Sequence, residues 1–204
     1  MKLEPSPATR TPPVMMTARL RLVAPALRHA PGLFAYGSRC DFTAFLDSVP
    51  FCAENEAQQF LRSLQRDNRS GKRLYWVAEV VGDGRAIGTL GLLFPFARHH
   101  RVAEFGYGFS PEVWGKGYFT EAAQAVMTYA FGVLALHRIQ AITRSSNVRA
   151  VRSIEKLGFH REAVLSEFYQ ERNGERSDAT LLALLAHSPR ARATAVRPNQ
   201  QGKS

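Results

Sequence analysis

The segment Ser110–Glu121, SPEVWGKGYFTE, has the residue types of an anion-binding turn. Gly115 and Gly117 lack side chains, so backbone N–H groups there can approach a bulky anion closely. The apolar spacing after Thr120 predicts a helix whose positive end and unpaired donors face the same place, and Lys116 adds a full positive charge. The segment therefore predicts a pyrophosphate site, while a plain tight turn before a helix fits the same residues.

The spacing of these glycines excludes two familiar nucleotide motifs. A P-loop requires Ser or Thr directly after Gly-Lys, where this chain has Gly117. The dinucleotide fingerprint G-x-G-x-x-G requires a third glycine at the position of Thr120. An anion held here therefore belongs to another class of ligand.

Hydrophobic patterns place the turn inside a domain that mixes strands and helices. Alternating apolar residues predict strands near 20–24, at 73–81, 86–94, 102–110 and 138–143, and two more strands within 160–186. Helical spacing predicts helices over 53–66, 120–134 and 148–157, and short helical pieces within 26–50. Turns are expected at Gly82–Gly84 and at Asn173-Gly174.

Two further features of this pattern concern topology and helix ends. The strand–helix–strand order from 102 to 143 predicts a parallel pair joined by a right-handed crossover, in a sheet whose other links are antiparallel. Thr120 is expected to cap the helix that follows the glycine turn. Gly158 is expected to end the next helix in a left-handed conformation.

The chain ends differ in composition from its middle. Residues 1–17 contain four prolines and are interpreted as a loose arm, residues 18–187 as one domain, and residues 188–204 as a basic tail that is expected to be disordered. The net charge of +10 is concentrated partly in that tail. A mildly basic domain suits an anionic ligand or an acidic partner and does not require a nucleic acid.

Composition also limits the chemistry. The two cysteines, Cys40 and Cys52, cannot form a disulfide framework or a four-ligand zinc site. His99, His100, His137 and His160 do not have the spacing of metal ligands, so no metal is expected. No apolar run has the length of a signal peptide or a membrane span, so a cytoplasmic protein without a membrane partner is expected.

The motifs of the second half resemble a known family. The order P-E-x-W-G-K-G-Y-x-T-E-A, helix, L-x-R-I, then N-x-x-A-x-x-x-x-E-K-x-G-F resembles the GNAT superfamily of acetyl-CoA-dependent N-acetyltransferases. Within it the chain looks most like the RimJ/RimL-type branch, the ribosomal-protein N-terminal acetyltransferases. The similarity runs from about residue 17 to 186. It implies an α/β fold with one mixed, mostly antiparallel sheet of about seven strands, a splayed central parallel pair and flanking helices.

The resemblance also implies where acetyl-CoA binds as co-substrate. The pyrophosphate would lie on the residues of the glycine turn: Gly115, Lys116, Gly117, Tyr118, Phe119 and Thr120. The backbone of Phe109 and Ser110 would pair with the pantetheine arm, and Asn147 would contact the coenzyme or orient its acetyl end. Arg152 shares a helix face with Arg149 and Lys156, and these side chains either bind the 3′-phosphate or form a solvated basic face.

Glu104 is the candidate general base. Acetyl transfer needs a neutral nitrogen. Deprotonating a lysine-like amine, with a pKa of about 10.4, costs roughly 4–5 kcal/mol at pH 7. An α-amine has a pKa of about 7.7–8.0, so its deprotonation costs less. Glu104 shares a strand face with Gly106 and Gly108, which leave room for a thin ligand, and the resemblance puts a base at this position. The alternative is a strand-edge Glu paired with Arg98 or Arg101.

The other groups of the reaction are less defined by the sequence. A backbone N–H near Phe109 is expected to stabilise the oxyanion. Family members often have Tyr at the position of Ile154 or Ser at that of Ala150, and this chain has neither. The proton for the leaving thiolate would then come from water, Tyr118 or Tyr107.

The expected function is an N-acetyltransferase in which the amine attacks acetyl-CoA directly in a ternary complex. The branch resemblance favours a protein N-terminus as acceptor, and a small amine such as an amino sugar, polyamine or antibiotic is the alternative. Two other classes remain: a non-catalytic acyl-CoA-binding regulator, and a nucleic-acid- or ribosome-binding protein that uses the basic tail. A homodimer is compatible with all of these.

Acceptor choice is expected in residues 26–72 and 165–178. The aromatic residues of the first range form either an apolar wall of the acceptor site or part of the core: Phe34, Tyr36, Phe42, Phe45 and Phe51.

Overall fold

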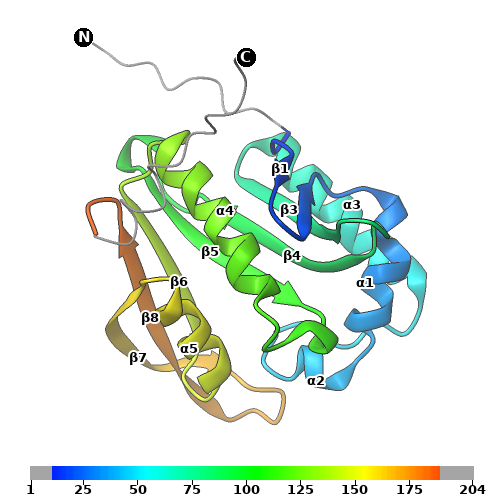
Figure 1. Ribbon diagram of the computed structural model, residues 1–204. Coiled ribbons are helices and arrows are strands. Elements are labelled where there is room, and N and C mark those ends of the chain that lie inside the picture. Colours follow the sequence, from blue (N-terminus) through cyan, green and yellow to red (C-terminus); the bar gives the residue numbers. More distant parts are fainter. Residues whose placement is uncertain (1–10, 189–204) are drawn as a thin grey trace, which may run out of the picture.

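A computed structural model describes residues 11–188, apart from the side chain of Arg98. These residues form one mixed sheet of eight strands in the order β1-β2-β3-β4-β5-β6-β8-β7 (Figure 1). The strands are β1 (Met15–Met16), β2 (Leu20–Val23), β3 (Arg73–Val80), β4 (Ala86–Leu93), β5 (Val102–Phe109), β6 (Arg138–Arg144), β7 (His160–Gln170) and β8 (Arg176–Leu185). The predicted α/β fold is confirmed, with one strand more than the seven expected.

The helices cover both faces of this sheet. They are α1 (Ala30–Gly37), α2 (Cys40–Thr43), α3 (Glu54–Ser70), α4 (Tyr118–Gly132) and α5 (Val148–Lys156), with single turns η1 (Leu27–His29), η2 (Arg98–His100) and η3 (Pro111–Val113). Figure 1 shows α4 lying across one face of the sheet. No helix in the described range is long and apolar enough to cross a membrane.

Alternation along β3 explains why the sheet has two cores. Trp76 and Ala78 are buried in the cluster that includes the α4 residues Val126 and Ala130. Val77 points the other way and is buried with residues of α1 and α3. Successive side chains of a strand point to opposite faces, so an apolar run such as that of β3 can be covered by helices on both sides.

The central strands β5 and β6 are parallel, as the strand–helix–strand order predicts, and they separate after three pairs. Val102, Ala103 and Glu104 are opposite Arg138, Ile139 and Gln140, and no further pairing joins the two strands within the described sheet. Beyond this point β5 stays paired with β4 as far as Phe109, and β6 stays paired with β8 as far as Arg144. The predicted splay is therefore present, and Glu104 is the last paired residue of β5.

Two local expectations are corrected. Met15 and Met16, within the arm expected to be loose, form a strand that pairs with β2, and Trp76 Nε1 donates a hydrogen bond to the Pro13 carbonyl at 2.9 Å. Thr120 does not cap α4: the helix begins two residues earlier, and its cap is Gly117. Residues 1–10 and 189–204, including nearly all of the basic tail, lie outside the described residues.

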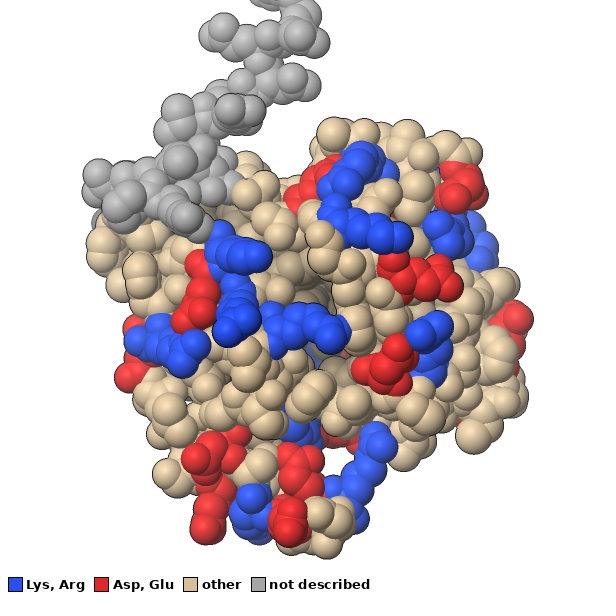
Figure 2. Space-filling view, turned by 60° about the horizontal axis from the view of Figure 1, so that its bottom comes forward, with Lys and Arg blue, Asp and Glu red and all other residues tan. Residues whose placement is uncertain are grey.

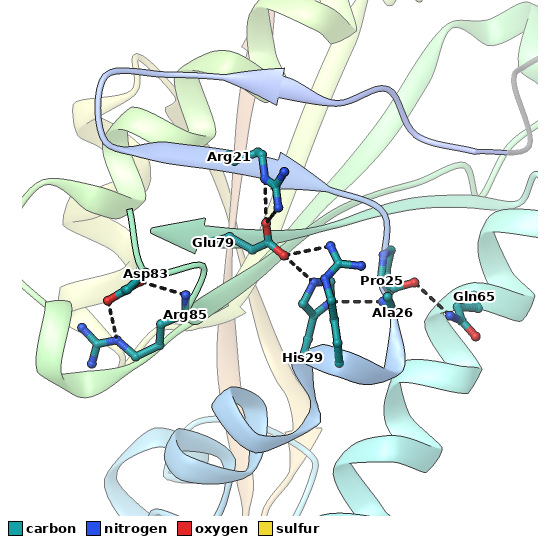
Figure 3. Close-up of polar contacts among 9 residues, drawn as sticks. Arg21, Pro25, Ala26, His29, Gln65, Glu79, Asp83 and Arg85 are labelled. Atoms are coloured by element: carbon teal, nitrogen blue, oxygen red, sulfur yellow. Dashed lines mark hydrogen bonds and ion pairs between the residues drawn. The ribbon is translucent and has the colours of Figure 1, made fainter. Parts of the chain in front are cut away.

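A buried carboxylate joins the first helical segments to the sheet (Figure 3). The side chain of Glu79 is only 2% exposed and binds Arg21 at 2.6 Å, Arg28 at 2.9 Å and His29 at 2.7 Å. His29 Nδ1 accepts a hydrogen bond from the Ala26 N–H at 3.0 Å, so the ring proton must lie on Nε2, which donates to Glu79. The buried carboxylate thus has charged partners, as such groups require.

This network makes folding sensitive to acid. Burial is the main effect on His29 and lowers its pKa below the ordinary 6.5, although Glu79 acts in the opposite direction. Burial raises the pKa of Glu79, but its hydrogen bonds from Arg21, His29 and Arg28 outweigh this and hold the pKa below the ordinary 4.5. The unfolded chain therefore binds protons more readily, and stability is lost as pH falls below about 6.5, with a further loss below about 4.5.

We predict that the melting temperature of the wild type falls between pH 7 and pH 5, and that His29→Gln flattens this slope. Glutamine keeps an amide donor for Glu79 but takes up no proton, so the first part of the acid loss disappears. Melting temperatures across this range, with His160→Gln at an exposed histidine as the control, check the prediction. A slope in His29→Gln equal to that of the wild type would contradict it.

Candidate active site

The turn before α4 presents a row of backbone donors. Gly115 and Gly117 have φ angles of +74° and +81°, a conformation that glycine adopts without strain. The first backbone bond into α4 runs from the Glu121 N–H to the Gly117 carbonyl at 3.0 Å. No described group accepts from the N–H groups of Gly115, Gly117, Tyr118, Phe119 or Thr120. A helix start with such free donors and a positive dipole end favours an anion.

Arg19 supports this turn from the side of the N-terminal strands. Its Nε binds Glu121 Oε2 at 2.7 Å, and its Nη1 donates to the Lys116 carbonyl at 3.0 Å. The guanidinium also lies over the Tyr118 ring, 4.1 Å from its centre. Glu121 additionally accepts from Thr17 Oγ1 at 2.6 Å and from the Arg19 N–H at 2.8 Å. These contacts hold the glycine turn in one position relative to β2.

The carboxylate in this cluster is held in its charged form. Burial raises the pKa of Glu121, but hydrogen bonds from Thr17 and from the Arg19 backbone and side chain outweigh it, so the net shift is downward. A charged Glu121 in the first turn of α4 is also favoured by the helix dipole. Arg19 was missed by the sequence analysis, because nothing near it in the chain indicates a partner 102 residues away.

Basic side chains surround the outer edge of the candidate site. Lys116 and Arg152 are exposed, and Arg149 lies over the Trp114 ring at 4.1 Å. Figure 2, which brings the bottom of Figure 1 forward, shows a hollow in the middle of this face with Lys and Arg side chains along its edges. Positive charge beside a recess raises the local concentration of an anionic ligand.

The end of β5 has some of its backbone groups already engaged. The Ser110 N–H donates to the Ile87 carbonyl at 2.8 Å, and the Ser110 carbonyl accepts from Val113 at 3.1 Å. Trp114 Nε1 donates to the Phe109 carbonyl at 2.9 Å. N–H groups of adjacent residues in a strand point to opposite sides, so the Phe109 N–H faces away from β4, toward the gap. Ser110 therefore has no unused N–H donor, and Phe109 does.

Asn147 has a structural role at the start of α5. Its Oδ1 accepts a hydrogen bond from the Ala150 N–H at 3.1 Å, which makes Asn147 the N-cap of that helix. Asparagine is among the preferred residues at this position. The oxygen of its amide is therefore directed at α5.

Glu104 lies where the gap begins. Its half-buried side chain shares a face with Gly106, where an added Cβ would have a single neighbour, 4.0 Å away, and with Gly108, where it would meet the Phe42 ring at 3.0 Å. Among the described side chains, Arg101 included, none forms an ion pair with Glu104; the Arg98 side chain lies outside that set. Its carboxylate is close enough to influence the titration of Arg73, Tyr75 and Tyr169.

Tyr107 projects from the opposite face of the same strand. Its ring stacks on Phe119 with centroids 4.0 Å apart, and its buried hydroxyl has no hydrogen-bond partner in the described structure. Burial raises the pKa of Tyr107, so the hydroxyl stays protonated at neutral pH. The other tyrosine considered, Tyr118, has its ring against Arg19 instead.

A cavity of about 560 Å³ lies at the end of β6 that carries Arg144. Its walls come from the segment after α2, the end of β6 and the β7–β8 turn: Ala44, Leu46, Asp47, Arg144, Gln170, Glu171, Arg172 and Asn173. The Tyr169 ring stacks on Arg144, one of the residues of the cavity wall. Acceptor choice was expected in residues 26–72 and 165–178, which include the segment after α2 and the β7–β8 turn but not Arg144 of β6.

The aromatic residues of the first third belong mostly to the core. Tyr36 is buried, and Phe34, Phe42 and Phe51 pack against the same cluster, whereas Phe45 is 42% exposed. Phe42 fits both expectations, core and apolar wall, because its ring also covers Gly108 on the face of Glu104. Within residues 11–188 no group of three or more His, Cys, Asp or Glu side chains is arranged to hold a metal ion.

The comparison with known proteins identifies the family. A family model described as an acetyltransferase (GNAT) domain matches residues 19–160. The chain belongs to the GNAT acetyltransferase family. It is an acetyl-CoA-dependent acyltransferase.

Three relatives indicate how far this likeness extends. The GNAT chain is 28% identical over 173 residues to the uncharacterized N-acetyltransferase YoaA of Bacillus subtilis, covering 85% of this chain and 97% of the relative. It is 38% identical over 89 residues to spermidine N(1)-acetyltransferase of Escherichia coli, covering 43% and 47%. The structure of Mycobacterium smegmatis RimJ in complex with CoA-disulfide shares the fold, with a TM-score of 0.74, 22% identity and coverage of 89% and 91%.

We predict that Gly117→Glu abolishes stabilisation of this GNAT protein by coenzyme A. The variant places a carboxylate among the free N–H groups and forces a side chain into a left-handed conformation, which costs about 1–2 kcal/mol. Thermal-shift titrations with acetyl-CoA, coenzyme A and ATP measure the effect. Gly174→Glu is the matched control, because Gly174 has a φ of +87° and no atom within 4 Å of an added Cβ. Equal coenzyme shifts in both variants would contradict the assignment of the turn.

Proposed function

We propose that this enzyme transfers the acetyl group of acetyl-CoA to a primary amine, with Glu104 as the general base. The observation that carries the proposal is the half-buried Glu104 carboxylate, which has no ion-pair partner among the described side chains. It stands beside the open space at Gly106, at the last residue pair before β5 and β6 separate. A carboxylate placed beside a gap and without a cationic partner among the described side chains is suited to take a proton from a bound ammonium group.

The coenzyme occupies the gap and the turn in this proposal. Its pyrophosphate lies on the free N–H groups between Gly115 and Thr120, with Lys116 as the nearby cation. Of the two residues at the strand end, Phe109 provides the pairing with pantetheine, because the Ser110 N–H and carbonyl are already bonded within the protein. Asn147 acts by fixing the start of α5, and the exposed Arg152 binds the 3′-phosphate from that helix.

The reaction then proceeds by direct attack. Glu104 accepts a proton from the ammonium group, directly or through water, and the neutral nitrogen attacks the thioester carbonyl. The Phe109 N–H stabilises the oxyanion. As the C–S bond breaks, the Tyr107 hydroxyl donates a hydrogen bond to the sulfur. The nitrogen passes its second proton to water, and the released thiolate takes up a proton from water.

For the acceptor, we propose the N-terminus of a polypeptide. An α-amine has a pKa of about 7.7–8.0, so a single carboxylate suffices to deprotonate it near neutral pH. The cavity beside Asp47 and Arg172 has room for the first side chains of a peptide.

A small polyamine is the second candidate. The local similarity to spermidine N(1)-acetyltransferase favours it, as do the carboxylates of Asp47 and Glu171 in the cavity wall. Two arginines in the same wall, Arg144 and Arg172, balance these charges, and for that reason a peptide is preferred.

We predict that Glu104→Gln lowers the rate of transfer at pH 7 by about 100-fold or more, the usual contribution of a general base. Coenzyme stabilisation in thermal-shift assays stays unchanged, because the substitution does not touch the glycine turn. The residual rate rises about tenfold per pH unit below the amine pKa, because only the free base reacts. Release of free thiol, measured with a panel of peptides and a panel of small amines, gives both the rate and the acceptor class.

Glu162→Gln is the control for this substitution, because Glu162 pairs with Arg138 on the same sheet. A Glu104→Gln variant that transfers acetyl at the wild-type rate would show that Glu104 has no part in the mechanism. Coenzyme binding without transfer to any amine would instead favour the non-catalytic regulator.

We predict that Tyr107→Phe lowers kcat about tenfold or more without lowering the melting temperature. The hydroxyl has no partner in the described structure, so its removal breaks no hydrogen bond of the resting enzyme. Single-turnover rates and melting temperatures are compared with those of Tyr129→Phe. This control removes the hydroxyl of another tyrosine, whose ring contacts Trp76. An unchanged kcat would remove the Tyr107 hydroxyl and its hydrogen bond to the sulfur from the mechanism.

A further inference from the structure

Arg144 is a buried arginine at the end of β6 whose contacts all lie on other elements. Its side chain is 8% exposed. Nη1 donates to the Phe45 carbonyl at 2.9 Å, Nη2 to Asp47 at 2.8 Å and Nε to Glu171 at 2.8 Å. The guanidinium also stacks on the Tyr169 ring at 4.2 Å. Its donors are thus divided between the segment after α2 and the β7–β8 hairpin.

The segment that Arg144 binds is anchored at its far end, where the Phe51 N–H donates to the Gly37 carbonyl at 3.0 Å and the Phe51 ring packs against the cluster of α1 and α3. Its middle depends on side chains that reach it from other elements. Residues 44–53 contain neither helix nor strand, and their side chains are largely exposed, with Phe45 at 42% and Val49 at 64%. Besides Arg144, Arg172 reaches this segment from the hairpin and donates to the Ser48 carbonyl. An exposed segment without regular structure depends on such contacts for a fixed position.

Only an arginine can make this set of contacts. Its planar guanidinium directs donors along several fixed directions and keeps a flat face for an aromatic ring. Here the donors satisfy one carbonyl and two carboxylates while the face covers Tyr169. A lysine at the same position would have a single nitrogen and no flat face.

The position of this segment determines the shape of the cavity at the end of β6. Asp47 and Leu46 form one wall, and Glu171 and Asn173 form the opposite wall. Arg144 lies between them and is bonded to both sides. Movement of residues 44–48 away from the hairpin would therefore widen the cavity and displace the wall.

We propose that Arg144 is a positioning residue that locks residues 44–48 to the β7–β8 hairpin and so shapes the acceptor pocket. The proposal rests on the proposed function, in which the amine binds in this cavity. Arg144 touches neither the reacting atoms nor the coenzyme turn in this scheme. Its loss affects how the amine is held and leaves acetyl-CoA binding intact.

The kinetic test uses Arg144→Met in the full chain. The KM for the amine is expected to rise on the order of 10- to 100-fold, since small displacements of positioning groups have effects of that size. The KM for acetyl-CoA stays within about twofold. Arg144→Lys is expected to resemble Arg144→Met, because a retained charge without the planar fork cannot restore the contacts. Proportional changes in both KM values would indicate a general loss of structure and overturn the proposal.

A matched control exists on the same strand. Arg138 begins β6, as Arg144 ends it, and forms a two-point pair with Glu162 at 2.8 and 2.6 Å. Arg138→Met removes an arginine and its ion pair from the other end of β6. The proposal requires that this variant keeps the wild-type KM for the amine.

A second readout separates this proposal from the proposed function. Hydrogen exchange of the backbone amides of residues 45–49 needs no substrate, and exchange is expected to accelerate in Arg144→Met and, less strongly, in Asp47→Ala. Asp47 is 79% exposed, so Asp47→Ala keeps the fold even if Arg144→Met does not. Exchange rates that stay unchanged in a folded Arg144→Met variant or in Asp47→Ala would overturn the proposal that Arg144 holds residues 44–48 against the hairpin. If exchange is faster in Arg144→Met but the wild-type protein acetylates no amine, the positioning role of Arg144 is supported and the proposed function is rejected.

Discussion

The separation of β5 from β6 after Glu104 is the constraint on which the rest of this domain depends. Each strand keeps its other neighbour, β4 or β8, so the sheet stays continuous although its centre is open. Backbone groups on the inner side of β5, such as the Phe109 N–H, are then left without a strand partner. Unpaired backbone donors inside a sheet favour an added extended chain, and the pantetheine arm of the co-substrate has amides suited to that role.

The two faces of β5 give the gap two different environments. Ala103, Phe105 and Phe109 are buried toward α4, and Phe119 packs among these aromatic rings. The other face has Glu104, followed by Gly106, which is next to open space, and Gly108, which lies beneath the Phe42 ring. In the proposed reaction the apolar face would hold the thioester while the carboxylate on the other face takes a proton from the amine.

Ion-pair clusters position the segments that surround this gap. Glu79 joins η1 and β2 to β3, Arg19 joins the N-terminal strands to the glycine turn, and Arg144 joins the segment after α2 to the hairpin. In the first and last of these the central side chain is buried, and removing one member would leave a buried charge without its partner. Such clusters fix a single arrangement of loops that apolar packing alone would leave variable.

The sequence by itself determined most of the secondary structure of this protein. Hydrophobic alternation predicted the strands from β2 to β8, helical spacing predicted α3, α4 and α5, and Gly158 ends α5 in the expected left-handed conformation with a φ of +99°. The order of motifs was enough to assign the acetyltransferase family. These features depend on local residue patterns, because the period of the hydrophobic residues and the backbone freedom of glycine act within a few positions of the chain.

Only the tertiary structure decided which distant residues meet. The contact of Arg144 with Asp47 spans 97 residues, and that of Arg19 with Glu121 spans 102, so no local pattern distinguishes these arginines from those on the surface. The short strand β1 depends on pairing with β2, and the start of α4 depends on the left-handed Gly117, which moved the cap from Thr120. The availability of the Phe109 N–H and the engagement of Ser110 likewise follow from neighbouring strands and from Trp114. Side-chain partners and unused donors depend on which surfaces come together when the chain folds, and local sequence does not contain that information.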